Sequence, residues 1–271
     1  MRFVFAVGLE GTGHHMFGKV LDDLFVTNGN LLQISHKDDD VVEDLYTINF
    51  SMGGDARYYG TQVRSAREQM RALAKRDATI PFPGTVAYPR DRHRFHSYPS
   101  DPGPNKALGY LDLRLLAEVA EEEGVDLRVL YLRRPAKDLI IANTVHRRFQ
   151  MSLHNAEPST PEEKYMQYMQ VLFTDIAVVH SLLAELGSGF VVCHDFNRLG
   201  NVEQSAEISE FLAPTAELAA LLNQSFISVA GAPRAPSKES LPYEGADEVA
   251  ARLQQKFDSF ESELCSGRKK D

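Results

Sequence analysis

A glycine-rich turn stands between an unbroken apolar run and an amphipathic segment near the start of the chain. The run Phe3 to Val7 (FVFAV) has the composition of a strand buried on both faces of a parallel sheet. GLEGTGHH follows at residues 8–15, and apolar residues at helical spacing continue to Phe25. The spacing GxxxxG is that of a phosphate-binding loop, in which backbone amides and the helix dipole receive an anion. The pattern therefore predicts a strand, an anion-binding turn and a helix.

Two histidines occupy the positions where a nucleotide triphosphatase has lysine followed by serine or threonine. These residues are His14 and His15. Without the lysine on the terminal phosphates and the hydroxyl on magnesium, triphosphate chemistry loses two of its main parts. Adjacent helical residues point in different directions, so the pair is poorly placed to share a metal ion. Two simpler interpretations stay open: a turn that only permits close strand–helix packing, and an exposed histidine cap.

Apolar runs alternate with segments of helical periodicity along the rest of the chain. Strands are predicted at 129–132 and around 190–193. Helices are predicted at 59–75, 111–123, 136–149, 161–186, 202–212, 215–223 and 247–264. The stretch 26–60 is interpreted as loops and short elements, and 81–104 as a functional loop because prolines lie among Arg and His. This order predicts a three-layer α/β fold with a mostly parallel central sheet, forming a single domain over 1–271.

The charge balance is acidic, with 29 Lys and Arg against 38 Asp and Glu and a net charge of −9. No nucleic-acid partner is expected, because such binding needs clustered positive charge. No membrane partner is expected either, because Glu10 follows the first apolar run and no segment approaches the roughly 18 apolar residues of a spanning helix. Cys193 and Cys265 lie far apart without CxxC spacing. Neither a disulfide framework nor a zinc site is predicted, and a cytoplasmic location is expected.

A local excess of positive charge contrasts with this acidic total. Between Arg128 and Arg148, six Lys and Arg residues accompany one acid, a local sum of +5. Arg133 and Arg134 directly follow a predicted strand, at the sheet edge where open α/β sheets bind ligands and where the glycine turn also lies. This position favours a bound polyanion. A solvated basic helix face is the alternative, and it explains Arg147 and Arg148 better than the strand-end pair.

Three segments resemble, in chain order, motifs of the sulfotransferase family. GLEGTGHHM resembles the family's 5′-phosphosulfate loop, YLRRPAKDLIIAN its 3′-phosphate motif, and FVVCHDFNRL its later strand. The resemblance extends from residue 3 to about residue 199. It implies a P-loop NTPase-like fold, 3′-phosphoadenosine 5′-phosphosulfate (PAPS) as the sulfuryl donor, and a small-molecule or carbohydrate acceptor.

The resemblance also implies which residues bind the donor. The family's Ser-Gly-Thr-Thr positions, which hold the 5′-phosphate and the sulfate, correspond to Thr12, Gly13, His14 and His15. Arg134 takes the 3′-phosphate role by the ungapped match, and Arg133 is the alternative register.

Two positions depart from the family's pattern within these motifs. Gly11 stands where the family has Lys or Arg, although it belongs to the predicted donor loop. Ala142 stands where the family has the Ser that binds the 3′-phosphate. His14 is the candidate substitute for the first function, and Asn143 or Thr144 for the second.

The segment RHRFHSYPS supplies the candidate base. Transfer to a hydroxyl needs a group that removes the hydroxyl proton, and histidine suits this near neutral pH. His96 resembles the family's histidine ahead of a proline-containing turn, so it is the predicted catalytic base, with His14 acting on the leaving oxygen. His93 is the alternative, and loop histidines that contact only backbone or solvent remain equally open.

These features predict a PAPS-dependent sulfotransferase that acts on a hydroxyl, or an amine, of a small molecule or sugar. A P-loop ATP-dependent small-molecule kinase is one alternative, with Asp195 as the magnesium ligand. A catalytically inactive nucleotide-binding module is the other, favoured by Gly11 and Ala142. No motif specifies the acceptor or the oligomeric state.

Overall fold

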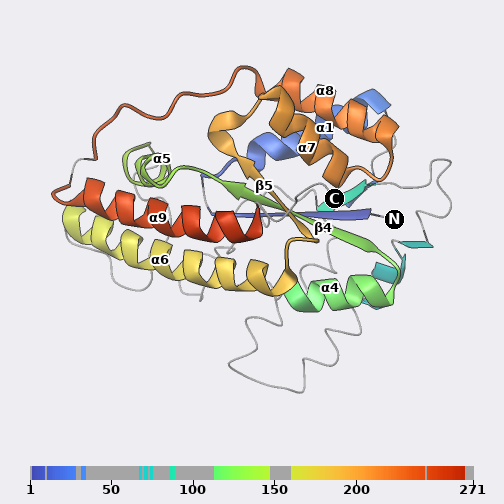
Figure 1. The fold of residues 1–271 in the computed structure, drawn as a ribbon, viewed down its shortest axis with the longest axis horizontal. Coiled ribbons are helices and arrows are strands. Elements are labelled where there is room, and N and C mark those ends of the chain that lie inside the picture. Colours follow the sequence, from blue (N-terminus) through green and yellow to red (C-terminus); the bar gives the residue numbers. More distant parts are fainter. Residues whose placement is uncertain are drawn as a thin grey trace.

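A five-stranded sheet forms the centre of the computed structural model, with the strand order β2-β3-β1-β4-β5 (Figure 1). All of its strand pairs are parallel. The structure describes residues 2–9, 11–28, 32–34, 67, 68, 70–72, 74, 75, 86–89, 113–146, 160–241 and 243–265.

Three strands with long apolar runs form the middle and one side of the sheet. They are β1 (Arg2–Gly8), β4 (Asp126–Arg133) and β5 (Val191–Asp195). Each residue of β1 pairs with β4, from Arg2 with Asp126 to Gly8 with Leu132. Because the strands are parallel, the ends of β1, β4 and β5 meet at one edge of the sheet, and the segments that follow them are close neighbours.

Helices cover both faces of the sheet (Figure 1). One face packs on α1 (His14–Asn28), α7 (Val202–Leu212) and α8 (Ala216–Ala230). The opposite face packs on α4 (Leu113–Glu122), α5 (Ala136–Ile141), α6 (Pro161–Leu186) and α9 (Ala246–Leu264). Neighbouring residues of β1 face the two cores in turn, with Val4 in one and Phe5 in the other. The predicted three-layer α/β fold with a parallel central sheet is confirmed.

Most predicted helices match the structure closely. The bounds of α4, α7 and α9 agree within two residues with the prediction, whereas α8 continues to Ala230, beyond the predicted end at 223. Helix α6 begins with a capping box, in which Thr160 Oγ1 accepts from the Glu163 N–H and Glu163 accepts from the Thr160 N–H, both at 3.2 Å. After α5 the chain makes a π-helical turn, Ala142–His146. The rest of the predicted helix to 149, and residues 59–66, lie outside the described residues.

Two short strands were missed by the sequence analysis. They are β2 (Leu32–Ile34), in the stretch interpreted as loops and unspecified short elements, and β3 (Val86–Pro89), in the stretch interpreted as a loop. Their three and four residues are too few to show a hydrophobic period. Strand β3 reaches β1 through only two residue pairs, Arg2 with Val86 and Phe3 with Ala87.

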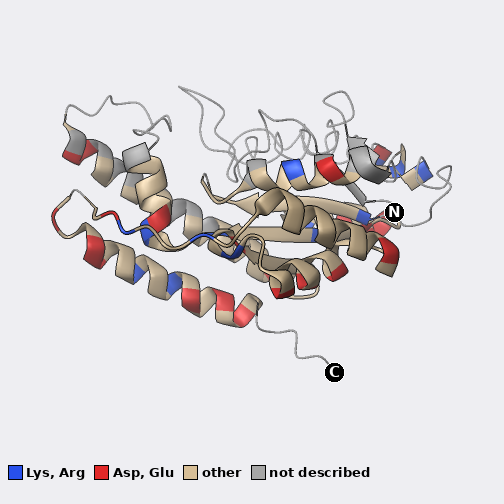
Figure 2. Cartoon of the chain, turned by 90° about the horizontal axis from the view of Figure 1, so that it is seen from above, with Lys and Arg blue, Asp and Glu red and all other residues tan. Residues whose placement is uncertain are grey.

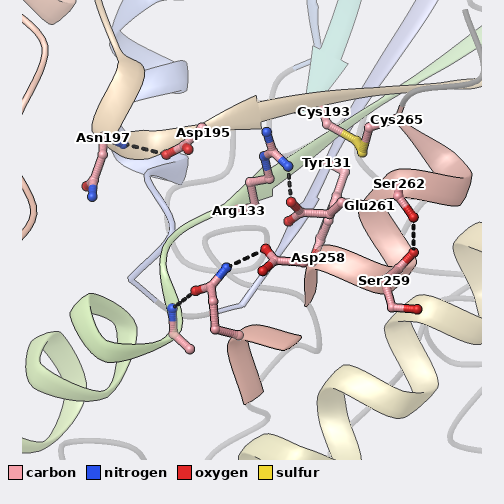
Figure 3. Close-up of polar contacts among 12 residues, drawn as sticks. Tyr131, Arg133, Cys193, Asp195, Asn197, Asp258, Ser259, Glu261, Ser262 and Cys265 are labelled. Carbon is pink, nitrogen blue, oxygen red and sulfur yellow. Dashed lines mark hydrogen bonds and ion pairs between the residues drawn. A yellow bond between two sulfur atoms is a disulfide. The ribbon is translucent and has the colours of Figure 1, made fainter. Parts of the chain in front are cut away.

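A disulfide joins β5 to the end of α9, so the prediction that the two cysteines stay apart is wrong (Figure 3). Cys193 and Cys265 are 72 positions apart in sequence, yet their Cα atoms are 5.8 Å apart. The reason is tertiary, because α9 returns along the sheet and ends beside β5. Linear spacing carries no signal of this approach.

Two buried histidines have depressed pKa values. His180 of α6 lies 3.0 Å from the Tyr131 hydroxyl through Nε2 and stacks on Phe260, and burial lowers its pKa to about 4. His194 of β5 meets Gln204 at 2.8 Å through Nδ1. Burial, followed by the charges of neighbouring arginines, lowers the pKa of His194 to about 3. Both rings are therefore neutral in the folded protein near neutral pH.

These histidines predict a loss of stability in mild acid. The unfolded chain protonates histidine near its ordinary pKa of about 6.5, whereas the folded protein does so only far below it, so the unfolded state binds more protons as pH falls. Stability is expected to be full above about pH 6.5 and to fall toward pH 4, by on the order of 3 kcal/mol for His180 alone. Urea unfolding of wild type and His180→Gln at pH 7.5 and pH 5 measures this. An equal pH dependence in both proteins would contradict the assignment to His180.

Candidate functional site

The glycine turn connects β1 to α1 at the carboxyl edge of the sheet. Thr12 is buried, with 2% of its surface exposed, and its hydroxyl donates to the Leu9 carbonyl oxygen at 2.6 Å. The Thr12 N–H donates to the same oxygen at 3.1 Å. The side chain of Thr12 therefore braces the turn from inside, which is a different role from the phosphate contact that the resemblance implies.

Gly13 is the residue that caps helix α1. Its carbonyl oxygen accepts from the N–H groups of Met16 at 3.0 Å and Phe17 at 3.1 Å. The N–H groups of His14 and His15 come before the helix's own hydrogen-bond ladder, at the positive end of its dipole. The backbone here has the arrangement that binds anions at helix starts. The side chains of His14 and His15 lie outside the described residues.

Phe196 packs directly on Gly13, a contact that the sequence analysis missed. Gly13 has φ +109°, and a Cβ built on it would stand 2.6 Å from Cδ2 of the Phe196 ring. Phe196 follows β5 immediately and is 9% exposed. Its place within FVVCHDFNRL gave no sign of this contact, because the two segments lie 183 positions apart.

Gly13→Ala is expected to destabilise the protein by at least about 1 to 2 kcal/mol, because the added methyl meets the Phe196 ring and the positive φ strains an L-residue. Gly18→Ala is the matched control. Gly18 lies within α1 with open space around its Cβ position, so alanine there should stabilise by about 0.5 to 1 kcal/mol. Urea unfolding compares the two variants. Equal stabilities would show that the Phe196 contact does not constrain the turn.

Arg134, in the segment YLRRPAKDLIIAN, contacts the glycine turn. It follows β4, and its Nη1 donates to the Gly11 carbonyl oxygen at 3.2 Å, joining segments 123 positions apart. Its guanidinium carbon lies 4.7 Å from the centre of the Phe196 ring, a cation–π contact. Among the described residues, no acceptor lies within hydrogen-bonding distance of its buried Nε. The strand-end arginine and the glycine turn thus form one site, with donor capacity left for an anion.

The electrostatic environment of Arg134 mixes burial with charges of both signs. Burial lowers the pKa of its guanidinium, the Asp138 carboxylate opposes that change, and the positive charge of Arg234 adds to it. An arginine nevertheless remains protonated in proteins. A half-buried cation next to a second cation gains stability when an anion binds between or beside them.

Gly11 and Ala142, the two positions that depart from the sulfotransferase pattern, lie close together in the structure. Gly11 has φ +91°, which favours glycine over the Lys or Arg of the family. A Cβ at Gly11 would lie 3.3 Å from Nδ2 of Asn143 and 3.6 Å from Cβ of Ala142. The second motif therefore packs its first helical turns directly on the glycine turn. Asn143 is buried and donates to the Leu139 carbonyl oxygen at 3.0 Å, so its amide nitrogen supports the π-helical turn.

Arg133, the alternative candidate for the 3′-phosphate role, pairs with α9 and not with the glycine turn. It forms an ion pair with Glu261 of α9 (Figure 3). It also lines a pocket beside Cys193 and Cys265. Of the two adjacent arginines, Arg134 is the one that the structure places on the glycine turn.

The segment between α8 and α9 contributes residues that the sequence analysis left without a role. The guanidinium of Arg234 lies 4.8 Å from the centre of the Phe196 ring. The backbone N–H of Arg234 donates to the Asn197 carbonyl oxygen at 2.9 Å. The buried carboxylate of Asp138 accepts from Asn197 Nδ2 at 2.7 Å and from the Ser237 N–H at 2.9 Å. Figure 2 shows Lys and Arg along this irregular segment. The sequence feature that could have identified this segment is the presence of basic residues within a Pro/Ser-rich stretch.

Other predicted site residues are placed less directly. His96 and His93 lie outside the described residues. Asp195, the magnesium ligand of the kinase alternative, accepts from the Asn197 N–H at 2.9 Å and so caps the turn after β5 (Figure 3). Within the described part of the chain, no group of three or more His, Cys, Asp or Glu side chains is arranged to hold a metal ion. None of the helices described there is both long and apolar enough to span a membrane.

Comparison with known proteins adds little to this site. No protein-family model matches the chain, and no curated protein matches it. Among solved structures, the APS kinase of Mycobacterium tuberculosis in complex with AMPPNP and APS is similar, at 12% identity and a TM-score of 0.27, over 63% of this chain and 96% of that one. A likeness of this size carries no functional argument, so the function must be argued from the site itself.

Proposed function

We propose that the chain is a sulfotransferase of the cytoplasm that moves the sulfuryl group of PAPS to a hydroxyl, or an amine, of a small molecule or carbohydrate. The observation that carries this proposal is the contact between Arg134 and Gly11. In this contact a cation from the segment that resembles the 3′-phosphate motif meets the turn that resembles the 5′-phosphosulfate loop. The order of the three motifs along the chain supports the same reaction.

The described residues fit a ligand with anions at both ends. The backbone N–H groups of His14 and His15, at the start of α1, would hold the 5′-phosphosulfate. Arg134 would bind the 3′-phosphate through its guanidinium, and Arg234 adds a second positive charge on the same aromatic ring. Asn143 supports this wall of the site from within. When bound, PAPS supplies the sulfuryl group, and the protein supplies position and charge.

The catalytic roles fall to two histidines. His96 removes the proton of the acceptor hydroxyl as its oxygen bonds to sulfur. The bond from sulfur to the bridging phosphate oxygen breaks, and His14 gives that oxygen a proton or a hydrogen bond. The helix amides stabilise the charge that collects on the departing phosphate, and removing one such donor typically costs about 10²- to 10³-fold in rate.

His96→Ala is expected to lower turnover by about 10²- to 10⁴-fold, the usual contribution of a general base, and to leave adenosine 3′,5′-bisphosphate binding unchanged. The measurements are sulfuryl transfer from labelled PAPS and isothermal titration with the bisphosphate. His93→Ala is the matched variant in the same segment. Unchanged turnover in His96→Ala together with a loss in His93→Ala would transfer the base to His93.

Calorimetry of the wild-type chain tests the whole proposal. Adenosine 3′,5′-bisphosphate should bind more tightly than ATP with magnesium, and a panel of hydroxyl and amine acceptors should reveal sulfuryl transfer. Absence of bisphosphate binding would overturn the proposal, and tighter binding of magnesium ATP would favour the kinase. The close packing of Gly11 and Ala142 favours one other candidate, an inactive nucleotide-binding module. Tight bisphosphate binding without transfer to any acceptor would support that candidate.

A further inference from the structure

A pocket of about 90 Å³ opens beside the disulfide, between β5, α7 and the end of α9. None of its lining residues belongs to the glycine turn. Its polar and sulfur-containing lining consists of Arg133, Arg198, Gln204, Glu207, Cys193 and Cys265. The bond between Cys193 and Cys265 is therefore part of the pocket wall, and both cysteines are partly exposed. A molecule that enters the pocket therefore lies against the two disulfide-bonded cysteines.

The charges around this bond match a small carboxylate. Arg133 and Arg198 both line the pocket, and after burial their positive charges also lower the pKa of His194. Arg133 is paired with Glu261, but within the described residues its buried Nε has no acceptor. Arg198 is exposed. Glu207 is the one acidic residue in the lining, and it suits an ammonium group.

We propose that this pocket is a thiol–disulfide exchange site for a small thiol that carries a carboxylate, such as cysteine or a cysteine-containing peptide. The carboxylate binds the exposed guanidinium of Arg198, which holds the sulfur of the small thiol near the Cys193–Cys265 bond. In the proposed cytoplasmic location disulfides are usually transient or redox-sensing, which agrees with a partly exposed bond beside a pocket.

The exchange proceeds in two balanced steps. The thiolate of the small thiol attacks one cysteine sulfur, the Cys193–Cys265 bond breaks, and the other cysteine leaves as a thiolate. A second small thiol attacks the mixed disulfide and releases the second cysteine. Two small thiols are thereby oxidised to one disulfide, the protein disulfide is reduced to two thiols, and the protons are exchanged with solvent. The neighbouring arginines stabilise the cysteine thiolates as they leave.

Opening the bond acts on the last turn of α9. Cys265 ends this helix, and its N–H donates to the Glu261 carbonyl oxygen at 2.8 Å. Glu261 in turn holds Arg133 at the end of β4. Reduction therefore loosens the turn that keeps Arg133 paired, one residue before Arg134 of the candidate active site.

The test compares L-cysteine with cysteamine, which is cysteine without its carboxylate. Air-oxidised full-length protein is treated with each at equal thiolate concentration, and mass spectrometry after alkylation follows the appearance of free cysteines. Cysteine should react about fivefold faster, the scale of one charge-assisted contact at a partly exposed site. Arg198→Gln should remove this preference, while Arg252→Gln, an exposed arginine of α9 outside the pocket lining, should keep it. Glutathione serves as the peptide thiol.

Three results would overturn the proposal. The first is full alkylation of both cysteines in the oxidised protein without any reductant. The second is an equal rate with cysteine and cysteamine in the wild-type protein. The third is a preference for cysteine that survives in Arg198→Gln. A preference for glutathione over cysteine in wild type would support the site and identify a peptide as its better ligand.

Discussion

Replacing Arg134 with alanine is expected to weaken the binding of adenosine 3′,5′-bisphosphate by roughly 1.5 to 3 kcal/mol, a rise in Kd of about 10- to 150-fold. The range is that of a hydrogen bond to a charged group. The variant loses the guanidinium that reaches the Gly11 carbonyl oxygen, together with the Nε that has no acceptor among the described residues. Isothermal titration measures the effect, and urea unfolding of the same variant records any separate loss of stability.

Arg114→Ala is the control for the general loss of an arginine. Arg114 lies exposed on α4 and forms a 3.7 Å ion pair with Glu118, a surface pair that contributes little to stability. Its removal should leave bisphosphate binding unchanged. Arg134→Lys separates charge from geometry, because lysine keeps the charge but loses the second donor direction. If Arg134→Ala bound the bisphosphate as wild type does, Arg134 would have no part in ligand binding.

Reduction of the disulfide is expected to lower the free energy of unfolding by about 4 kcal/mol. The bond closes a loop of 72 residues, and a covalent link across a loop of that length restricts the unfolded chain to about that extent. The burial of α9 and its Lys137–Asp247 ion pair at the start of the helix remain in the reduced protein, so the helix is expected to stay folded apart from its last turn. Denaturant unfolding with and without a strong reductant measures the difference.

Cys265→Ala shows whether the bond itself causes this difference. In that variant the stability should be the same with and without reductant, and close to that of the reduced wild type. A reductant that left the wild-type unfolding curve unchanged would mean that the bond does not contribute. This stability measurement is independent of the cysteine and cysteamine rates, so either result can stand without the other.

The layered fold could be predicted because its central strands carry long apolar runs. Residues 3–5, 7 and 129–132 are buried, as their apolar sequence predicts for strands covered on both faces. The start of α6 could also be predicted from the sequence, because a capping box and a proline lie within four consecutive residues. Strands β2 and β3 lacked such signals, because a few residues held by neighbouring strands show no period of their own.

The candidate site was predicted in its centre but not in its surroundings. The glycine turn and Arg134 each belong to a contiguous motif, so their sequence context identified them. The pairing of Arg133 with Glu261 and the contact of Phe196 with Gly13 each join segments more than 120 positions apart. Such contacts depend on how the helices return across the sheet. No local pattern of residues records them.

The packing of Gly11 against the second motif limits how this protein can change over evolutionary time. A Cβ at Gly11 would touch Cβ of Ala142 and the side-chain amide of Asn143. A larger side chain at either position takes space from the other, so the turn after β1 and the helix after β4 must vary as a pair. A serine at position 142 is therefore compatible only with the smallest residue, glycine, at position 11.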